Sequence, residues 1–377
     1  MSTTPVLYSS GTFHSSDKRG FMGRRIVQLV LSAVVVSAGA GCGGFGLQGD
    51  FVPLSIIKSV SLLTGYQGSG IVVEGSQAYI ATEAIGSQSG ARSLVIVNVA
   101  TPSAPAVLST TSSGLTSDMA GIAVSGSYAY VPFESAAGTN FQVWDVSNPR
   151  SPSIVGSTAI ACPAGMYPFN NPAVYENYVY VSCWESEVTT TGAFAIVDVT
   201  NPASPVVAHS ISVTATYQPI SFAIWDQSLY VVATQGGSTS DYVLLYSIAN
   251  PGSPALMASQ PVPHSPQWVA AQGAAALAPI YDGTELQVID FSNPSSPRAA
   301  SASLGSCHPM SVAVYMGDLA MVSCDNPGGL AEVNVASVSR PVYLGTALSG
   351  TVFNDVAVAG SYLYGVDAGG NFEVMGP

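Results

Sequence analysis

Four of the five cysteines form two similarly placed pairs. Cys162 and Cys307 each precede a β-branched run, and Cys183 and Cys324 each end the run that follows, in YVSC and MVSC. Antiparallel neighbours bring the start of one strand beside the end of the next, so the pairs Cys162–Cys183 and Cys307–Cys324 are within disulfide reach. A metal site or four free thiols are the alternatives, but only His308 lies near a cysteine and no C-x-x-C spacing occurs. The sequence therefore predicts two disulfides in an oxidising compartment.

Other residues suited to catalysis are few. His209, His264 and His308 follow the N-terminal region, and none lies in a nucleophile elbow, a zinc-ligand spacing or a phosphate loop. Glu185 and Glu187 form the closest acidic pair, in a polar loop where solvation is a simpler role than general acid and base chemistry. We therefore predict no catalytic residue, no metal site and no cofactor.

The elements that would position these residues come from a repeated phrase. A strand, an Asn-Pro-x-Ser-Pro turn and a second strand recur at residues 94–110, 141–157, 194–210, 243–259 and 286–302, and in weaker form at 331–347. Between the phrases lie hairpin patterns such as GIAVSGSYAYV and DVAVAGSYLYGVD. Proline cannot donate to a strand ladder, so the Asn-Pro segments are loops. Each unit therefore has four strands, named a to d from first to last.

The period of the repeat predicts the fold. Equivalent turn positions are spaced by 47, 53, 49, 43 and 44 residues; they are Asn98, Asp145, Asp198, Ser247, Asp290 and Asn334. Four strands at this period are typical of propeller blades, and seven hairpins can be counted. The last unit lacks its d strand, whereas the segment 52–62 resembles one. We predict an all-β, seven-bladed propeller of four-stranded blades, closed by an N-terminal strand.

The phrases resemble the LVIVD repeat, a family of bacterial and archaeal surface-associated β-propeller repeats. VIVNV, AIVDV and QVIDF are the nearest matches, and the resemblance covers roughly residues 51–377. It implies a propeller scaffold and says little about activity, because propellers host many functions. We predict that the motif Asp is structural and accepts hydrogen bonds from turn amides.

The N-terminal region resembles the export sequence of a bacterial lipoprotein. Basic residues precede an apolar run at 26–40, which is shorter than the roughly 20 residues that span a bilayer. Gly39, Ala40 and Gly41 before Cys42 resemble a lipobox, although Gly39 stands where Leu is usual, which leaves an ordinary secreted protein as the alternative. We predict a signal peptide at 1–41, of which 1–21 could be an upstream extension, lipidation of Cys42, and a glycine-rich tether at 42–50.

The composition describes an acidic protein with few charges. Four of the nine basic residues and Asp17 precede Cys42, which leaves five basic and 21 acidic residues and a net charge of about −16. This charge repels nucleic acid and anionic lipid headgroups, so we expect neither as a partner. Hydrophobic residues make up 47% of the chain, enough for a large core.

The predicted functional surface is the face where the d-to-a and b-to-c loops surround the channel. Alignment of the units places polar or aromatic candidates there: Gln67, Asp118, Gln218, Ser265, Trp268 and His308, with Trp184 and Tyr217 nearby. Such residues suit a peptide or glycan site, although they could instead satisfy backbone groups and cap the channel. Trp144 and Trp225 fall inside strand patterns and are expected to pack between blades.

Two functions remain open at this stage. The first is a lipid-anchored, non-enzymatic, monomeric binding or scaffold protein for protein or carbohydrate partners at the cell envelope, on the outer membrane or cell surface, held to the membrane only through its N-terminal lipid. The second is a secreted hydrolase or oxidoreductase with a site in the channel. A cluster of carboxylates holding a metal would favour the enzyme, and a dry channel lined by Ala and Val would favour the binder.

Overall fold

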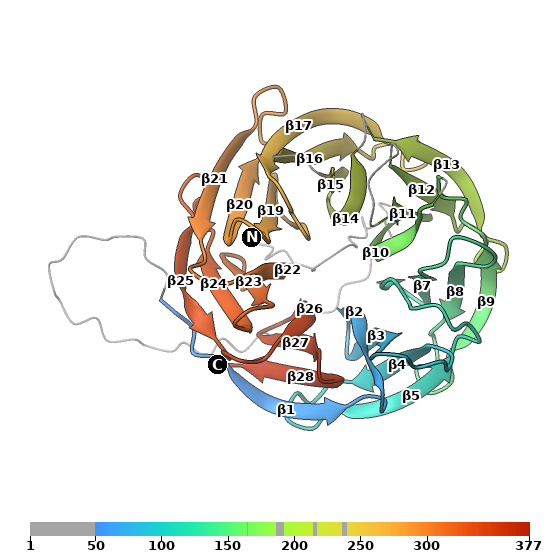
Figure 1. Ribbon diagram of the computed structural model, residues 1–377. Coiled ribbons are helices and arrows are strands. Elements are labelled where there is room, and N and C mark those ends of the chain that lie inside the picture. Colours follow the sequence, from blue (N-terminus) through green and yellow to red (C-terminus); the bar gives the residue numbers. More distant parts are fainter. Residues whose placement is uncertain (1–49, 164, 186–191, 214–216, 236–239) are drawn as a thin grey trace, which may run out of the picture.

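The protein is a ring of seven four-stranded antiparallel sheets, as the repeat predicts (Figure 1). The computed structural model describes residues 50–377 except 164, 186–191, 214–216 and 236–239. Its regular elements are all strands. Within each blade, strand a lies nearest the centre of the ring and strand d lies at the rim (Figure 1).

The blades follow the chain in order. Blade 1 contains β2 (Tyr66–Glu74), β3 (Gln77–Ala84), β4 (Ser93–Asn98) and β5 (Ala106–Ser112). Blade 2 contains β6 (Ala123–Ser125), β7 (Tyr128–Pro132), β8 (Phe141–Asp145) and β9 (Ser153–Thr158). Blade 3 contains β10 (Tyr167–Tyr175), β11 (Tyr178–Trp184), β12 (Ala193–Asp198) and β13 (Val206–Ser212). Blade 4 contains β14 (Gln218–Trp225), β15 (Ser228–Thr234), β16 (Ser240–Ser247) and β17 (Ala255–Pro263).

The remaining blades complete the ring. Blade 5 contains β18 (Ala270–Gln272), β19 (Ala275–Ile280), β20 (Glu285–Asp290) and β21 (Arg298–Ser303). Blade 6 contains β22 (Pro309–Tyr315), β23 (Leu319–Cys324), β24 (Gly329–Asn334) and β25 (Val342–Ala347). Blade 7 contains β26 (Phe353–Ala359), β27 (Tyr362–Asp367) and β28 (Asn371–Gly376), and its rim strand is β1 (Ser55–Ser61). β1 pairs antiparallel with β28, from Ser55 opposite Gly376 to Ser61 opposite Asn371.

Seven hydrophobic clusters hold the ring together, one between each pair of adjacent blades. The cluster between blades 1 and 2 contains Trp144, which is fully buried as expected, and Trp225 packs against the cluster between blades 4 and 5. Tyrosines add polar links across these interfaces: Tyr180 Oη donates to Pro251 O (2.9 Å), and Tyr230 Oη donates to Gly273 O (3.1 Å). Each interface is therefore apolar inside and fixed by hydrogen bonds nearer the surface.

The repeated turn has the structural role predicted for its acidic residue. Asp145, Asp198 and Asp290 each accept a hydrogen bond from the backbone N–H two residues later, at 2.8–2.9 Å. Hydrogen bonds from the side chain and then the backbone of Ser147 lower the pKa of Asp145, because they stabilise the ionised carboxylate. Those from the backbone and then the side chain of Ser292 lower the pKa of Asp290 in the same way. The motif residues are thus occupied in shaping the c-to-d loop.

Candidate functional site

At one end, the channel is lined by one residue from each blade, which lies four positions before the last residue of the inner strand. The strand registers place one such residue per blade, and we call these seven the channel positions. They are Gly70, Gly121, Asn171, Ser221, Trp268, Ser311 and Asp355. All seven are buried, and none is Ala or Val. This end of the channel is therefore not the dry passage lined by Ala and Val that the sequence allowed.

Asn171 and Asp355 meet across the channel. Asn171 Nδ2 donates to Asp355 Oδ2 at 2.9 Å, although blades 3 and 7 are not neighbours in the ring. Asn171 Oδ1 accepts from the Ile122 N–H (3.0 Å), and Asp355 accepts from the Ile71 N–H (3.0 Å). This bridge joins blades 1, 2, 3 and 7 and obstructs the passage.

Glycine at the two neighbouring channel positions makes room for the bridge. A Cβ atom on Gly70 or Gly121 would overlap Asn171 Oδ1. Burial raises the pKa of Asp355 to about 7, because desolvation of its charge outweighs the three hydrogen bonds that it accepts.

A cavity of ≈ 200 Å³ lies beside this bridge, lined by Asn170 and Asn354, which precede the two bridge residues, and we call it the cup. Residues one position before the channel positions line it in six of the seven blades, and its wall is completed by the channel residue Trp268, two glutamates and a phenylalanine. The lining residues are Ser69, Glu83, Ala120, Glu134, Phe169, Asn170, Gln267, Trp268, Met310 and Asn354. Ser69 Oγ is buried there and has no hydrogen-bond partner among the described residues. The cup thus combines aromatic rings with amide and carboxyl groups.

The two glutamates of the cup have perturbed acidities. Burial and, to a smaller degree, the nearby carboxylates of Glu83 and Asp118 together raise the pKa of Glu134 to about 7. Burial also raises the pKa of Glu83, against the hydrogen bond that its Oε1 accepts from Gln67 Nε2 at 2.6 Å. Arg92 Nε forms an ion pair with Asp118, 2.5 Å from its Oδ1. Near neutral pH, a carboxyl such as Glu134 can both donate and accept hydrogen bonds.

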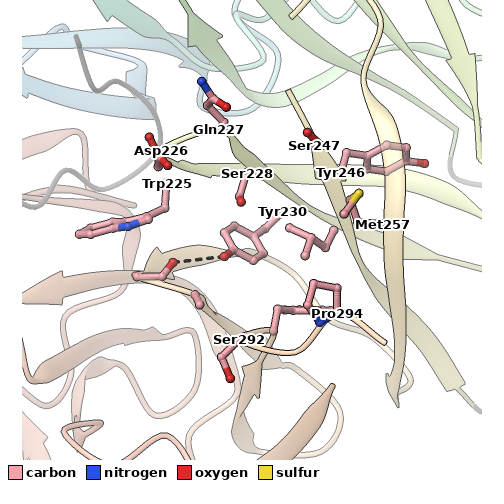
Figure 2. A pocket seen from close by; sticks show the side chains of 14 residues that line it. Trp225, Asp226, Gln227, Ser228, Tyr230, Tyr246, Ser247, Met257, Ser292 and Pro294 are labelled. Atoms are coloured by element: carbon pink, nitrogen blue, oxygen red, sulfur yellow. Dashed lines mark hydrogen bonds between the residues drawn. The ribbon is translucent and has the colours of Figure 1, made fainter. Parts of the chain in front are cut away.

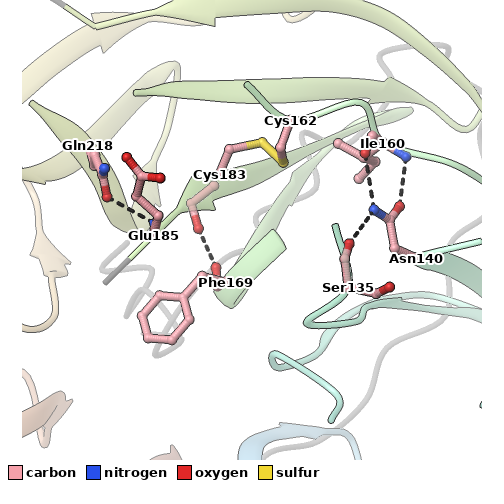
Figure 3. Close-up of a disulfide and its surroundings, with 9 residues drawn as sticks. Ser135, Asn140, Ile160, Cys162, Phe169, Cys183, Glu185 and Gln218 are labelled. Carbon is pink, nitrogen blue, oxygen red and sulfur yellow. Dashed lines mark hydrogen bonds between the residues drawn. A yellow bond between two sulfur atoms is a disulfide. The ribbon is translucent and has the colours of Figure 1, made fainter. Parts of the chain in front are cut away.

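The predicted disulfide Cys162–Cys183 is present and fixes the aromatic wall of the cup (Figure 3). Cys183 pairs with Pro168 in the strand register, and the next residue, Trp184, stacks on Phe169 with ring centroids 4.5 Å apart. The disulfide therefore ties the start of β10 to the end of β11 at the point where Phe169 lines the cup.

The second predicted disulfide, Cys307–Cys324, has the equivalent place in blade 6, with a Cα–Cα distance of 5.2 Å. His308 follows Cys307, and its ring lies 5.0 Å from that of Tyr281 in blade 5. Tyr281 Oη donates to Asp325 Oδ2 at 2.8 Å. Two disulfides agree with an oxidising, extracytoplasmic environment.

Of the six candidates predicted at the mouth, only Trp268 lines the cup. Gln67 donates a hydrogen bond to Glu83, which lines the cup, and Asp118 forms an ion pair with Arg92. Gln218 is fully buried, and its Oε1 accepts from the Glu185 N–H at 3.1 Å.

The other two candidates lie beside neighbouring loops. Ser265 donates its N–H to Asp241 Oδ2 at 2.8 Å. His308 exchanges backbone hydrogen bonds with the segment that follows β23: its N–H donates to Asn326 O, and its carbonyl accepts from the Asp325 N–H. Both residues therefore border the same face without lining the cup.

The sequence analysis missed Glu83, Glu134, Asn171 and Asp355. Glu83 and Glu134 close equivalent runs, YIATE and YVPFE, at the end of strand b. Asn171 and Asp355 are the first residues of NPAV and DVAV, whose equivalents in other blades are small or aromatic. Comparing the first letter of each inner strand across blades would have found both channel residues.

Some predictions concern residues outside the described part of the chain. Cys42, the signal peptide and most of the tether are among them, as is Glu187. Among the described residues, no helix has the length and hydropathy of a membrane span, and no three His, Cys, Asp or Glu side chains are grouped to hold a metal ion.

Sequence comparison identifies the repeat. The sequence model of the LVIVD repeat matches residues 117–159, 170–213 and 280–302, which fall in blades 2, 3 and 5. The chain therefore contains LVIVD repeats, as the residues of the phrase indicate. No curated protein matches the chain.

Solved structures of similar shape are proteins of varied function. Virginiamycin B lyase from Staphylococcus aureus, as a catalytically inactive variant with quinupristin, has a TM-score of 0.61 and 10% identity over 86% of this chain and 99% of its own. A putative 6-phosphogluconolactonase from Bacteroides fragilis has a TM-score of 0.59 and 12% identity, covering 77% and 86%. Hydrazine synthase from Kuenenia stuttgartiensis has a TM-score of 0.57 and 15% identity, covering 79% and 92%. At these identities the similarity shows the fold alone.

Proposed function

We propose that this LVIVD-repeat propeller is a lipid-anchored binding protein of the cell envelope, whose cup holds a glycan or peptide group of its partner. One observation carries the proposal: the cup lies beside the Asn171–Asp355 bridge and gathers aromatic rings, amides and carboxyl groups from several blades around one cavity. A recess with convergent polar groups is the usual form of a binding site.

The chemistry of the cup suits hydroxyl and amide groups. Phe169 and Trp268 offer apolar ring surface, and Asn170 and Asn354 offer amides that both donate and accept. Glu134, with its raised pKa, adds a group of the same dual character. These groups complement a sugar ring or a peptide terminus better than they complement an anion, because carboxylates dominate the charge at this mouth.

The test is a binding screen with a charge-matched control. Soluble envelope oligosaccharides and cell-wall peptides are titrated calorimetrically against the mature protein, Phe169→Ala, Glu134→Gln and Glu176→Gln. Glu176 lies on an exposed a-to-b turn at the far end of blade 3. We expect a ligand whose affinity falls about tenfold or more in the first two variants, equivalent to at least 1.4 kcal/mol, and stays unchanged in Glu176→Gln. Equal affinity in all four proteins would reject the cup as the site.

The two cup glutamates also support a second candidate, a hydrolase with its site in the channel. Glu134 has a pKa near the operating range of a general acid, and it feels the charge of Glu83. Turnover of a bound sugar that is lost in Glu134→Gln while binding persists would establish the enzyme; binding without turnover supports the binding protein.

A further inference from the structure

The two ends of the propeller differ in exposed apolar surface. We call the end formed by the a-to-b turns and the c-to-d loops the lower face; the cup opens at the other end. Among the described residues, nine of the eleven exposed large hydrophobic side chains lie at the lower face and are 36–55% exposed. They are Ile56, Ile57, Val107, Ile154, Val206, Val207, Leu256, Met257 and Met316. The tenth, Phe51, lies against Gly345 in the middle of the rim strand of blade 6. The eleventh, Ile85, follows a b strand at the cup end.

Most of these side chains occupy the same place in the repeat. Val107, Ile154 and Leu256 each lie near the start of a rim strand, beside the bulge that interrupts its pairing with strand c. Ile56 lies at the equivalent place in β1, and Val207 in β13. The repeat therefore places exposed aliphatic side chains around the lower rim of blades 7, 1, 2, 3 and 4. We call these five residues and their exposed neighbours Ile57, Val206 and Met257 the belt. Exposed apolar side chains gathered at one end of a protein favour an interaction site there.

The belt borders a hollow at the lower face. A cavity of ≈ 440 Å³ opens between blades 4 and 5, where Trp225, Tyr246 and Phe291 contribute aromatic surface and Met257 of the belt lies at its edge (Figure 2). The lower face thus has both exposed apolar side chains along its rim and a recess with aromatic walls.

Charges are also divided between the two ends. Four of the five basic residues in the described part of the chain lie at the lower face: Lys58, Arg150, Arg298 and Arg340. The fifth, Arg92, lies at the cup end and is paired with Asp118. The lower face also carries the turn residues Asp145, Asp198 and Asp290. Four further acidic residues lie at its a-to-b turns: Glu74, Glu176, Asp226 and Asp318. Acidic residues therefore outnumber basic ones there, and apolar contact is the main resource of this face.

The N-terminal tether joins the body on the outer wall of blade 6, midway along β24 and β25. Val52 N donates to the buried Glu332 Oε2 in blade 6 at 2.8 Å, and Leu54 is buried beside it. A Cβ on Gly345 would lie 3.0 Å from the Phe51 ring, so this ring rests on the rim strand of blade 6. Cys42 precedes Phe51 by nine residues, a reach of at most roughly 30 Å.

We propose that the lower face docks on the lipid bilayer that anchors the protein, with the belt in the interfacial layer and the cup directed away from the membrane. The proposal rests on the lipidation of Cys42 in the proposed function. A short tether that meets the wall of the body between its two ends allows either end to reach the lipid, and the exposed apolar side chains favour the lower face over the acidic cup end.

A matched pair of labels tests the orientation. The full lipidated chain carries an environment-sensitive nitrobenzoxadiazole label on Ile154→Cys at the belt, or on Ile85→Cys at the cup end. These native side chains are 41% and 39% exposed, so both substitutions are tolerable, and the four cysteines of the body are held in disulfides. Each protein is bound to zwitterionic phosphatidylcholine and phosphatidylethanolamine vesicles, with or without nitroxide-labelled lipid. We expect roughly twofold quenching and a blue shift for the belt label, and no change for the Ile85→Cys label.

A second variant separates the belt from the anchor. Val206→Asp with Met257→Asp places charges at two positions that are each 53% exposed, so the fold is retained. This protein should still sediment with vesicles through its lipid but lose the quenching of the Ile154→Cys label. If the labelled proteins without these Asp substitutions sediment but show equal quenching of both labels, or none, the docked orientation is overturned and the anchor stays intact. Undiminished quenching of the Ile154→Cys label in the double Asp variant would likewise overturn the role of the belt. Failure to sediment would overturn the anchor itself and the orientation with it.

Discussion

The bridge across the channel makes a sharp prediction for Asn171→Asp. The substitution keeps the shape of the side chain but places a second carboxyl against Asp355, at the site of a 2.9 Å hydrogen bond. At pH 5 the two carboxyls share a proton, and the O–H takes the place of the amide donor. We therefore expect stability within about 1 kcal/mol of the wild type at this pH.

At higher pH the variant should lose more stability than the wild type, which itself loses some as the buried Asp355 ionises. The folded state holds the shared proton with a pKa raised above the unfolded value, so its contribution is complete below about pH 4 and is lost as pH rises through the folded pKa. Burial already raises the pKa of Asp355 from 3.8 to about 7 in the wild type. A similar rise for the second carboxyl, about three pKa units, corresponds to about 4 kcal/mol at pH 8, or roughly 8 °C in Tm.

The assay is thermal unfolding of the wild type, Asn171→Asp and Asn177→Asp at pH 5 and pH 8, with matched scan rates. Asn177 lies in an exposed turn of the same blade, so its variant adds the same charge without burial. We expect the Asn177→Asp control to remain within about 0.5 kcal/mol at both pH values. If the difference in Tm between Asn171→Asp and the wild type were the same at pH 5 and pH 8, the bridge would not be the buried pair described above.

Three further changes probe the scaffold. Gly70→Ala should destabilise by about 1–3 kcal/mol, because its Cβ overlaps Asn171 Oδ1; in an Asn171→Ala background the additional cost should shrink, and equal costs in chemical denaturation of both backgrounds would contradict the overlap. Replacing Cys307 and Cys324 with alanine removes a bond that closes a loop of 17 residues in the unfolded chain, and this should cost about 3 kcal/mol. The Tm should fall and should no longer change on addition of reductant. An unchanged Tm would argue against the bond. Tyr230→Phe removes a hydrogen bond to the next blade and should cost about 1 kcal/mol in the denaturation midpoint, whereas a gain in stability would show that this bond is unimportant.

The fold could be predicted because its determinants are local and repeated. An Asn-Pro turn, a hairpin and a fixed period each constrain the backbone within one unit, and seven copies leave few alternatives. The disulfides followed from the same logic: the antiparallel hairpin of β10 and β11 brings the segment before β10, with Cys162, near Cys183 at the end of β11, and the structure has this bond. The turn carboxylates also act over two residues, as Asp198 does, and therefore show in the sequence.

The sequence predicted which end of the propeller carries the site, but not which residues line the cup. Whether Gln67 or Glu83 lines a cavity depends on how far each inner strand extends toward the centre, and the ring as a whole sets that distance. Gln218 resembles a rim residue in sequence, yet it is fully buried. The contact of Asn171 with Asp355 joins residues 184 apart in sequence, on blades that are not adjacent, so no pattern within one repeat contains it.

The channel positions suggest why the repeat is uniform in some places and varied in others. A blade can keep its partners only if its interface residues and turns are of one kind, so the repeat is strict in strands b and c and at the Asn-Pro loop. The channel axis is the one place where all seven blades meet, and identical side chains there would either collide or leave a void. Gly70 and Gly121 have no side chains and so leave room for Asn171, while Trp268 has a large ring at a position where other blades have smaller residues. Departure from the repeat at the axis thus creates a single asymmetric recess, and an asymmetric recess is what recognition of one particular ligand requires.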